Sequence, residues 1–63
     1  MKKLTKGQIV SVYQDPVTCT KLEGPAKLKK RLDTYADPGY EWWMVEFDGE
    51  GTTYQRKINL NKC

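Results

Sequence analysis

The sequence predicts an all-β protein, namely one small barrel of about five short antiparallel strands in which residues 1–63 form a single domain. The chain has 63 residues, enough for one modest core. Turn signals rich in Gly, Pro and Asp divide it into short segments, and apolar residues in several segments recur at the strand period of two. Curling such strands into a barrel removes most exposed edges and lets one core serve every strand.

The first predicted strand covers Gln8 to Gln14. Apolar residues occur on both of its faces, so periodicity alone does not choose the inner one. We expect Val10 and Val12 inside, because small β-branched residues suit a tight interior and Tyr13 can then keep its hydroxyl in water. A turn follows at Asp15, whose carboxylate is expected to accept backbone N–H groups.

Residues 26–32 allow two interpretations. As a strand, the segment separates its apolar residues from its basic ones, with Ala26, Leu28 and Leu32 inside and Lys27, Lys29 and Arg31 outside. Lys30 then falls on the inner face, at a bulge or near an edge. As a helix, Leu28 and Leu32 form an i,i+4 pair after Pro25 in the first turn. We prefer the strand, because strand signals surround the segment.

The clearest strand covers Tyr40 to Asp48. Its two faces carry different sets, with Trp43, Val45 and Phe47 on one and Trp42, Met44 and Glu46 on the other. The charge of Glu46 marks the outer face, so Trp43 is the core tryptophan and Trp42 faces solvent.

A turn over residues 48–51, with two glycines, leads into a returning strand from Thr52 to Lys57. On that strand, Arg56 is expected to pair with an acidic residue of the strand 41–48. Ile58 and Leu60 then close the core as a short last strand or a 3₁₀ turn. Earlier in the chain, Glu23 is expected to accept backbone N–H groups in its own turn.

The segment Lys6-Gly7-Gln8-Ile9-Val10-Ser11-Val12 resembles the opening of SH3-like barrels, including KOW-type domains, with Gln8 in place of the usual Asp. A longer resemblance, to short stand-alone proteins of bacteria and phages, covers residues 12–18, 22–28, 41–48 and 54–58. That pattern has a variable polar residue at the position of Trp42. The resemblance implies an SH3-like barrel with Trp43 inside and Trp42 outside, and it implies no particular activity.

Composition argues against an enzyme. The chain has no histidine, which removes the commonest general base and metal ligand. It also lacks a phosphate-cradling Gly-rich loop and a nucleophile elbow, and its paired carboxylates fall in predicted turns. We therefore expect no catalytic residue, no metal and no cofactor.

Two cysteines, Cys19 and Cys63, are too few for a disulfide framework, so we expect both as reduced thiols. The N-terminus has basic residues without a following apolar stretch, and no apolar run approaches the roughly 18 residues of a spanning helix. These features predict a cytoplasmic monomer without membrane contact.

Charge patterning suggests the first functional hypothesis. Residues 1–31 hold eight basic and two acidic side chains, whereas residues 32–51 hold six acidic side chains and no basic one. On an outward strand face, Lys27, Lys29 and Arg31 would form a stripe suited to phosphates, so we expect a binding module for nucleic acid or nucleoprotein. The structural alternative is that these bases protect an edge strand or pair with acids across the sheet.

Exposed aromatic residues suggest the second hypothesis. Tyr13, Trp42 and Tyr54 could share one outer patch, of the kind that holds peptides on small barrels. The protein would then be a protein–protein interaction module, for example a phage-type accessory protein. The structural alternative is ordinary pairing of aromatic rings across strands.

Overall fold

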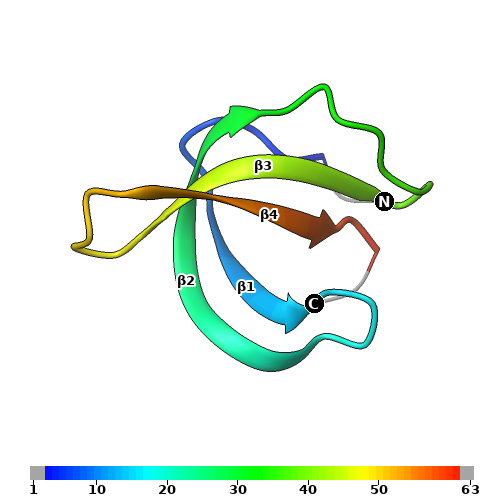
Figure 1. The fold of residues 1–63 in the computed structure, drawn as a ribbon, viewed down its shortest axis with the longest axis horizontal. Helices are drawn as coiled ribbons and strands as arrows, with labels where there is room; N and C mark the ends of the chain where they lie inside the picture. The colour runs from blue at the N-terminus through cyan, green and yellow to red at the C-terminus, as the bar shows by residue number, and fades with distance from the viewer. Residues whose placement is uncertain (1–2, 62–63) are drawn as a thin grey trace.

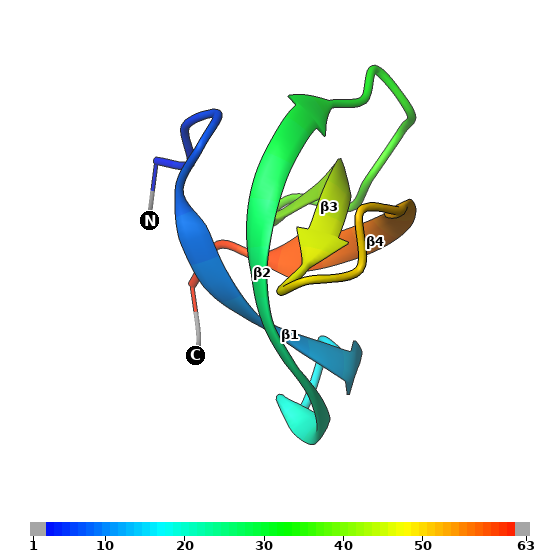
Figure 2. The same cartoon turned by 90° about the vertical axis from the view of Figure 1, so that its left-hand side faces the viewer.

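The protein is all-β, as the sequence predicts. The structure, a computed structural model, describes residues 3–61 and contains four antiparallel strands: β1 (Ile9–Asp15), β2 (Thr20–Arg31), β3 (Tyr40–Phe47) and β4 (Thr53–Asn59). They form one sheet in the order β1-β2-β3-β4. The long strand β2 curves strongly, so the sheet bends around its own core (Figures 1 and 2). Within residues 3–61 no backbone ladder joins β1 to β4, so the sheet is open and closure of a barrel is not confirmed.

Two predicted breaks in the chain are absent, which explains why four strands form where about five were expected. The turn signal at Glu23-Gly24-Pro25 lies inside β2, where Gly24 adopts a φ of 136° and Pro25 stands opposite Ser11. No separate last strand forms within residues 3–61, because Ile58 belongs to β4 and Leu60 follows it directly, with the Leu60 N–H donating to the Gly39 carbonyl at 2.7 Å. Turn residues thus occur where a strand bends and continues, as well as where a strand ends.

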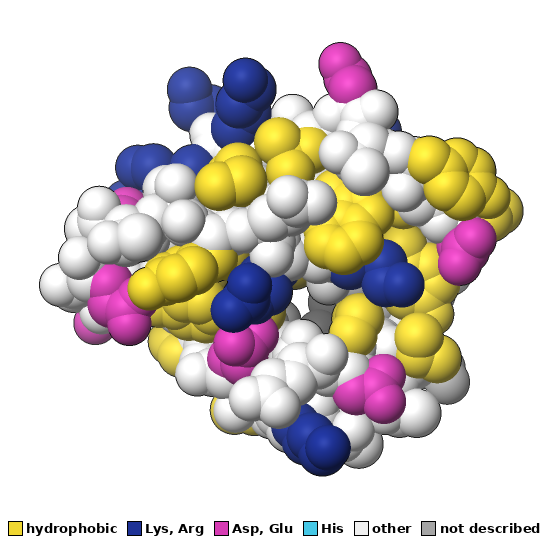
Figure 3. All heavy atoms as spheres, in the orientation of Figure 1, with side chains coloured by type: hydrophobic (Ala, Val, Ile, Leu, Met, Phe, Trp, Pro, Cys, Tyr) yellow, Lys and Arg dark blue, Asp and Glu magenta, His cyan; other side chains and the backbone are white. Residues whose placement is uncertain are grey.

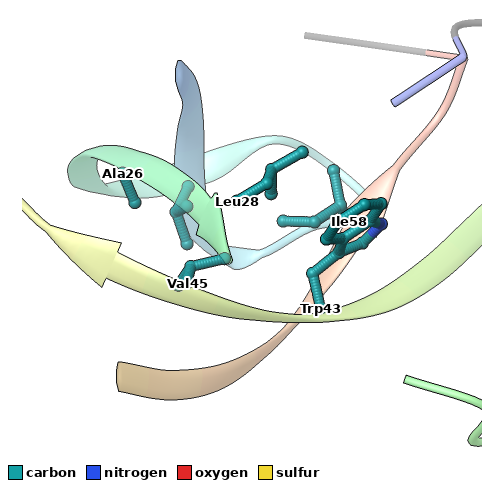
Figure 4. Close-up of a cluster of buried hydrophobic side chains, with 6 residues drawn as sticks. Ala26, Leu28, Trp43, Val45 and Ile58 are labelled. Carbon is teal, nitrogen blue, oxygen red and sulfur yellow. The ribbon is translucent and has the colours of Figure 1, made fainter. Parts of the chain in front are cut away.

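The core gathers side chains from all four strands. The buried cluster consists of Val12, Ala26, Leu28, Trp43, Val45 and Ile58, with Leu4, Val10 and Phe47 packed against it. Figure 4 shows its labelled members pointing into one space from β2, β3 and β4. Trp43 is 3% exposed, so the predicted inward face of β3 is confirmed. Residues 26–31 are a strand, which also settles the choice between strand and helix.

Two irregularities in β2 decide which of its side chains share a face. The register shifts between Val12 and Tyr13, which leaves Glu23 without an opposite residue on β1. It shifts again between Leu28 and Lys30, which leaves Lys29 without one on β3. Each is a β-bulge, in which one strand carries one residue more than its partner.

The second bulge corrects the predicted arrangement of the basic residues. Lys30 lies opposite Met44, on the outer face and exposed, and not inside as expected. Arg31 lies opposite Trp43, on the side that faces the core, and not on the outer stripe. The extra residue Lys29 reverses the alternation, because a shift of one residue moves every following side chain to the other face.

The turn after β1 forms as predicted. The Asp15 Oδ1 atom accepts the N–H groups of Val17 at 3.1 Å and Thr18 at 3.3 Å. Hydrogen bonds from Thr18 and Val17 lower the pKa of Asp15 below its ordinary value, because they favour the charged carboxylate. In the same turn Cys19 is disulfide-bonded, so the expectation of a reduced thiol is wrong for this residue; Cys63 lies outside the described residues.

Candidate functional site

The two strands at the ends of the sheet face each other across a groove. Its first part is lined mainly by apolar residues of the N-terminal segment, β1 and β4, among them Leu4, Ile9, Val10 and Ile58. Its second part is lined by Trp42, Gln55, Glu23 and Arg56. Both parts share Tyr13, Pro16 and Lys57, and we call the whole the seam groove. Figure 3 shows a hollow between the surface over β4 and that over the end of β1.

Backbone groups of β1 point into the seam groove. The Leu28 N–H donates to the Gln8 carbonyl at 2.8 Å, which sets the phase of the β1–β2 ladder. Hydrogen-bonded positions alternate along an antiparallel pair, so Val10 and Val12 bond to β2 while Ile9 and Ser11 direct their N–H and C=O groups away from it. Pro25 opposite Ser11 fits this phase, because proline has no N–H to offer.

The same alternation applies to β4. The bond from the Leu60 N–H to the Gly39 carbonyl sets the phase of the β3–β4 ladder. Lys57 and Asn59 therefore direct their backbone groups away from β3 and toward the groove. At one end, the Asn59 side-chain amide donates to the Pro16 carbonyl at 2.9 Å and holds β4 against the turn that follows β1.

The edge presented by β1 is uncharged except for Asp15 at its end. From Ile9 to Gln14 every side chain is neutral, and Ile9 is 58% exposed. Natural edge strands are usually protected by lysine or another charged residue, which discourages pairing with a further strand. β4 has this protection in Arg56 and Lys57, whereas the charged residue of β1 is Asp15, at its last position. The β1 edge is thus open to an additional strand.

Lys57 is the charged residue common to both parts of the groove. Its Nζ atom lies 5.1 Å from the centre of the Tyr40 ring and 6.0 Å from that of Trp42. These distances permit cation–π attraction, which holds the ammonium group without neutralising it. None of the ion pairs recorded among residues 3–61 involves Lys57. A positive charge therefore stands in the groove with aromatic rings beneath it.

Trp42 lies on the outer face of β3, as predicted, but it is only half-exposed. Its indole N–H donates to the Tyr35 carbonyl at 3.1 Å, so the loop before β3 covers one side of the ring. Tyr13 joins Trp42 in lining the groove. Two of the three residues of the predicted aromatic patch are thus brought together.

Tyr54, the third residue of that patch, lies on the other face of the sheet. It stands opposite the buried Val45, and its ring centre is 5.8 Å from that of Phe47. A hydrogen bond to Glu50 raises the pKa of Tyr54. The patch Tyr13/Trp42/Tyr54 therefore does not form as one surface, because Val45 and Tyr54 share the inward face of the hairpin.

Arg56 and Glu23 form a bidentate pair within the second part of the groove. The Arg56 Nε lies 2.8 Å from Glu23 Oε1, and Nη2 lies 3.1 Å from Oε2. The hydrogen bonds to Glu23 raise the pKa of Arg56 above its ordinary value. The expected partners were wrong for both residues, since Arg56 was predicted to pair within the strand 41–48 and Glu23 with backbone N–H groups. The bulge at Glu23 was not visible in the sequence pattern.

The predicted basic stripe is divided and largely paired with acids. Lys29 Nζ lies 3.4 Å from Glu46, and Arg31 lies 3.2 Å from Glu41 and 3.8 Å from Asp33. Arg31 is on the side of Trp43, whose indole N–H donates to Glu41 at 3.0 Å. Lys27 remains exposed on the outer face without an ion pair among the described residues.

The described residues include neither a cluster of side chains suited to a metal ion nor a membrane-spanning helix. Between residues 3 and 61 no group of three or more His, Cys, Asp or Glu side chains is placed to hold a metal ion. None of the described segments is a helix long and apolar enough to cross a membrane. Fold and site together define a small open β-sheet with a groove between its end strands. Comparisons with protein-family models, curated proteins and solved structures give no match.

Sequence reasoning missed Lys57 and the edge of β1. The signals were present, since the strand from Ile9 to Gln14 is uncharged and Lys57 follows Arg56 at the end of a strand. Their importance depends on which strands end the sheet, and the order of strands cannot be read from periodicity.

Proposed function

We propose that this protein is a small non-enzymatic binding module that holds an extended peptide segment of a partner protein in the seam groove. The proposal keeps the expected SH3-like architecture, with the groove at the position where a further strand would complete a barrel. Small domains of this size lack room for a buried cofactor and commonly act by surface recognition.

One observation carries the proposal: the groove combines an aromatic wall, a cation and an unpaired strand edge. Trp42 and Tyr13 supply flat apolar surface, Lys57 supplies charge, and Ile9 and Ser11 supply backbone donors and acceptors that no strand within residues 3–61 receives. Peptide recognition uses the same combination, with backbone hydrogen bonds for affinity and side-chain pockets for specificity.

A display experiment tests this function. A phage-displayed library of random twelve-residue peptides is selected against the immobilised protein, and enriched sequences are synthesised and titrated. We expect enriched peptides that bind the native protein and lose about tenfold or more in affinity with Trp42→Ala. Tyr54→Ala is the matched control, because it removes an exposed aromatic ring on the other face. Selection that enriches no peptide would contradict the proposal.

Nucleic-acid binding is a second candidate, favoured by the bulge in β2. Because Lys29 is an extra residue, the outer face carries Lys27, Lys29 and Lys30. Of these three lysines, Lys29 is the one with an ion pair among residues 3–61. The stripe is therefore Lys27 with Lys30, and not Lys27, Lys29 and Arg31 as the sequence suggested. The partner would be nucleic acid or nucleoprotein.

A salt titration with a single-stranded oligonucleotide tests this candidate. Binding should weaken steeply as salt rises, and the double variant Lys27→Ala/Lys30→Ala should weaken it further and reduce the salt slope by about 1.4. Lys57→Ala is the control, because Lys57 lies on β4 and not on the β2 stripe. Absence of binding at low salt would dismiss nucleic acid as the partner.

The compartment of the module depends on Cys19. The sequence favours a cytoplasmic monomer, whereas a bonded Cys19 is typical of an oxidising environment. We propose the cytoplasm, where a bonded Cys19 would be an exception to the usual reduced state. The test is fractionation of the native cell, in which the protein should be recovered with the cytoplasmic proteins. Recovery from a secreted or periplasmic fraction would contradict the proposed compartment.

A further inference from the structure

We propose that the bound peptide adds as a strand to the free edge of β1 and presents a carboxylate side chain to Lys57. This inference rests on the proposed function and specifies both the binding mode and the ligand chemistry. The occupant is an extended, acidic peptide segment of a partner protein.

The mode follows from the backbone of β1. Ile9 and Ser11 each offer an N–H and a C=O group that no strand within residues 3–61 receives. Unpaired backbone groups on a neutral edge are a template for strand addition, in which the incoming chain bonds at every second residue. The exposed side chain of Ile9 and the ring of Tyr13 then give the added strand apolar surface to cover.

The charge of the ligand follows from the charges that line the groove. Glu23 and Arg56 neutralise each other at 2.8 Å. Lys57 is the remaining charged residue among those lining either part, and its ammonium group rests on Tyr40 and Trp42. A carboxylate on the ligand would complete a charge-assisted contact there at no cost to an existing ion pair.

The shape of the groove favours a single peptide strand over a second copy of this chain. The β1 strand of another copy is attached to its own β2 along one side, so it carries a whole sheet with it. β4 forms the opposite wall of the groove, and the contact of Asn59 with Pro16 at 2.9 Å holds that wall close to the end of β1. A single extended chain brings no second sheet into this space.

Proline substitution on the edge tests strand addition. In Ser11→Pro the lost N–H is one that β2 does not use, so the native ladder is kept and only the outward donor disappears. We expect the affinity of a selected peptide to fall about tenfold or more. Thr53→Pro is the matched control, because Thr53 also turns its N–H away from its neighbouring strand but lies on β4 outside the groove. Loss with Thr53→Pro and none with Ser11→Pro would overturn the inference.

N-methylation of the peptide backbone gives an answer even if Ser11→Pro does not fold. A strand that pairs along one edge donates at alternate residues, so N-methyl groups should abolish binding at every second position and be tolerated between them. Equal tolerance at all positions would contradict strand addition. Equal loss at all positions would mean that the peptide bonds to both walls of the groove and would overturn pairing along the β1 edge alone.

Charge substitution tests the ligand chemistry. Lys57→Gln should weaken an enriched acidic peptide about tenfold, and replacing the peptide's acid by its amide should weaken the native protein by a similar factor. Lys30→Gln, an exposed lysine on β2, should change affinity little. Enriched peptides without an acidic residue, or peptides insensitive to Lys57→Gln, would overturn this part.

The results of these experiments distinguish failure of strand addition from failure of peptide binding. If selection enriches no peptide, the proposed function fails. If enriched peptides require Trp42 but show no effect of Ser11→Pro and no alternation on N-methylation, peptide binding stands and strand addition fails. Oligomerisation of the free protein through the same edge would replace the peptide by a second copy and would also overturn the inference.

Discussion

The two faces of the β3–β4 hairpin use the same kinds of residue for different purposes. Trp43 and Arg56 lie inward, opposite each other, where the indole is 3% exposed and the guanidinium is bound to Glu23. Trp42 and Lys57, their immediate neighbours, lie outward, also opposite each other, where the ring is half-exposed and the ammonium has no acidic partner among the described residues. One step along the strand separates a structural pair from a pair available to a ligand.

The comparison teaches that satisfaction of charge, more than residue type, distinguishes the two pairs. Arg56 has bidentate hydrogen bonds and two aromatic neighbours, with the Tyr54 ring centre at 5.4 Å and the Phe47 ring centre at 5.9 Å. Lys57 has the aromatic neighbours without the acid. A charged side chain that already has an acidic partner stabilises the fold. A charged side chain without one can still form an ion pair with a ligand.

The largest difference is expected between the tryptophans. Trp43→Ala should destabilise the protein by roughly 3–5 kcal/mol, because it empties the centre of a small core. Trp42→Ala should cost about 1 kcal/mol, from one lost hydrogen bond and partial burial. Urea unfolding followed by circular dichroism measures both. Equal losses would show that Trp42 is structural and would remove the basis of the comparison.

The bidentate pair should contribute the next largest effect. A double-mutant cycle with Arg56→Gln and Glu23→Gln should give a coupling free energy of about 1–2 kcal/mol, since both groups are partly sheltered and doubly hydrogen-bonded. The measurement is the free energy of unfolding of the four proteins. A coupling free energy near zero would mean that the pair of Arg56 with Glu23 does not stabilise the fold.

A smaller effect is expected for Lys57. Lys57→Gln should change the free energy of unfolding by about 0.5 kcal/mol, the scale of an exposed cation–π contact. The same variant should weaken peptide binding about tenfold. Comparing thermal unfolding with the peptide titration separates the two. A loss of stability as large as that of Arg56→Gln would assign Lys57 to the fold.

The smallest effect is expected for the ion pair on the outer face of β2. The Lys29 and Glu46 side chains are 43% and 30% exposed, so a double-mutant cycle with Lys29→Gln and Glu46→Gln should give about 0–0.5 kcal/mol. Raising the salt concentration should remove most of it. A coupling as large as that of Arg56 with Glu23 would show that exposure does not decide the value of these pairs.

Much of the fold could be predicted from local pattern. The alternation around Trp43 and the charge of Glu46 placed the inward face of β3, and the Asp15 turn followed from side-chain chemistry. In the alternation of β2, Lys30 falls on the inner face, which predicts a bulge or an edge there, and a bulge is found at Lys29. The resulting faces of Lys30 and Arg31 could not be predicted, because the position of the extra residue depends on how β2 fits β3. The partner of Arg56 was missed for the same reason.

The candidate site was predicted only in part. Tyr13 and Trp42 do line one groove, because both are outward aromatic residues on strands of the same sheet. Tyr54 was placed with them although strand pairing sets it opposite Val45. The groove itself depends on which strands remain unpaired at the ends of the sheet, a property of the whole topology that no single segment encodes.

The bulge at Lys29 also bears on how the chain can vary in length. Leu28 stands opposite Val45 and Lys30 opposite Met44, so a chain lacking Lys29 would pair with β3 as an uninterrupted ladder. Deletion of one residue within a strand normally turns every later side chain to the wrong side. Here, homologous chains one residue shorter at this point could keep the same core.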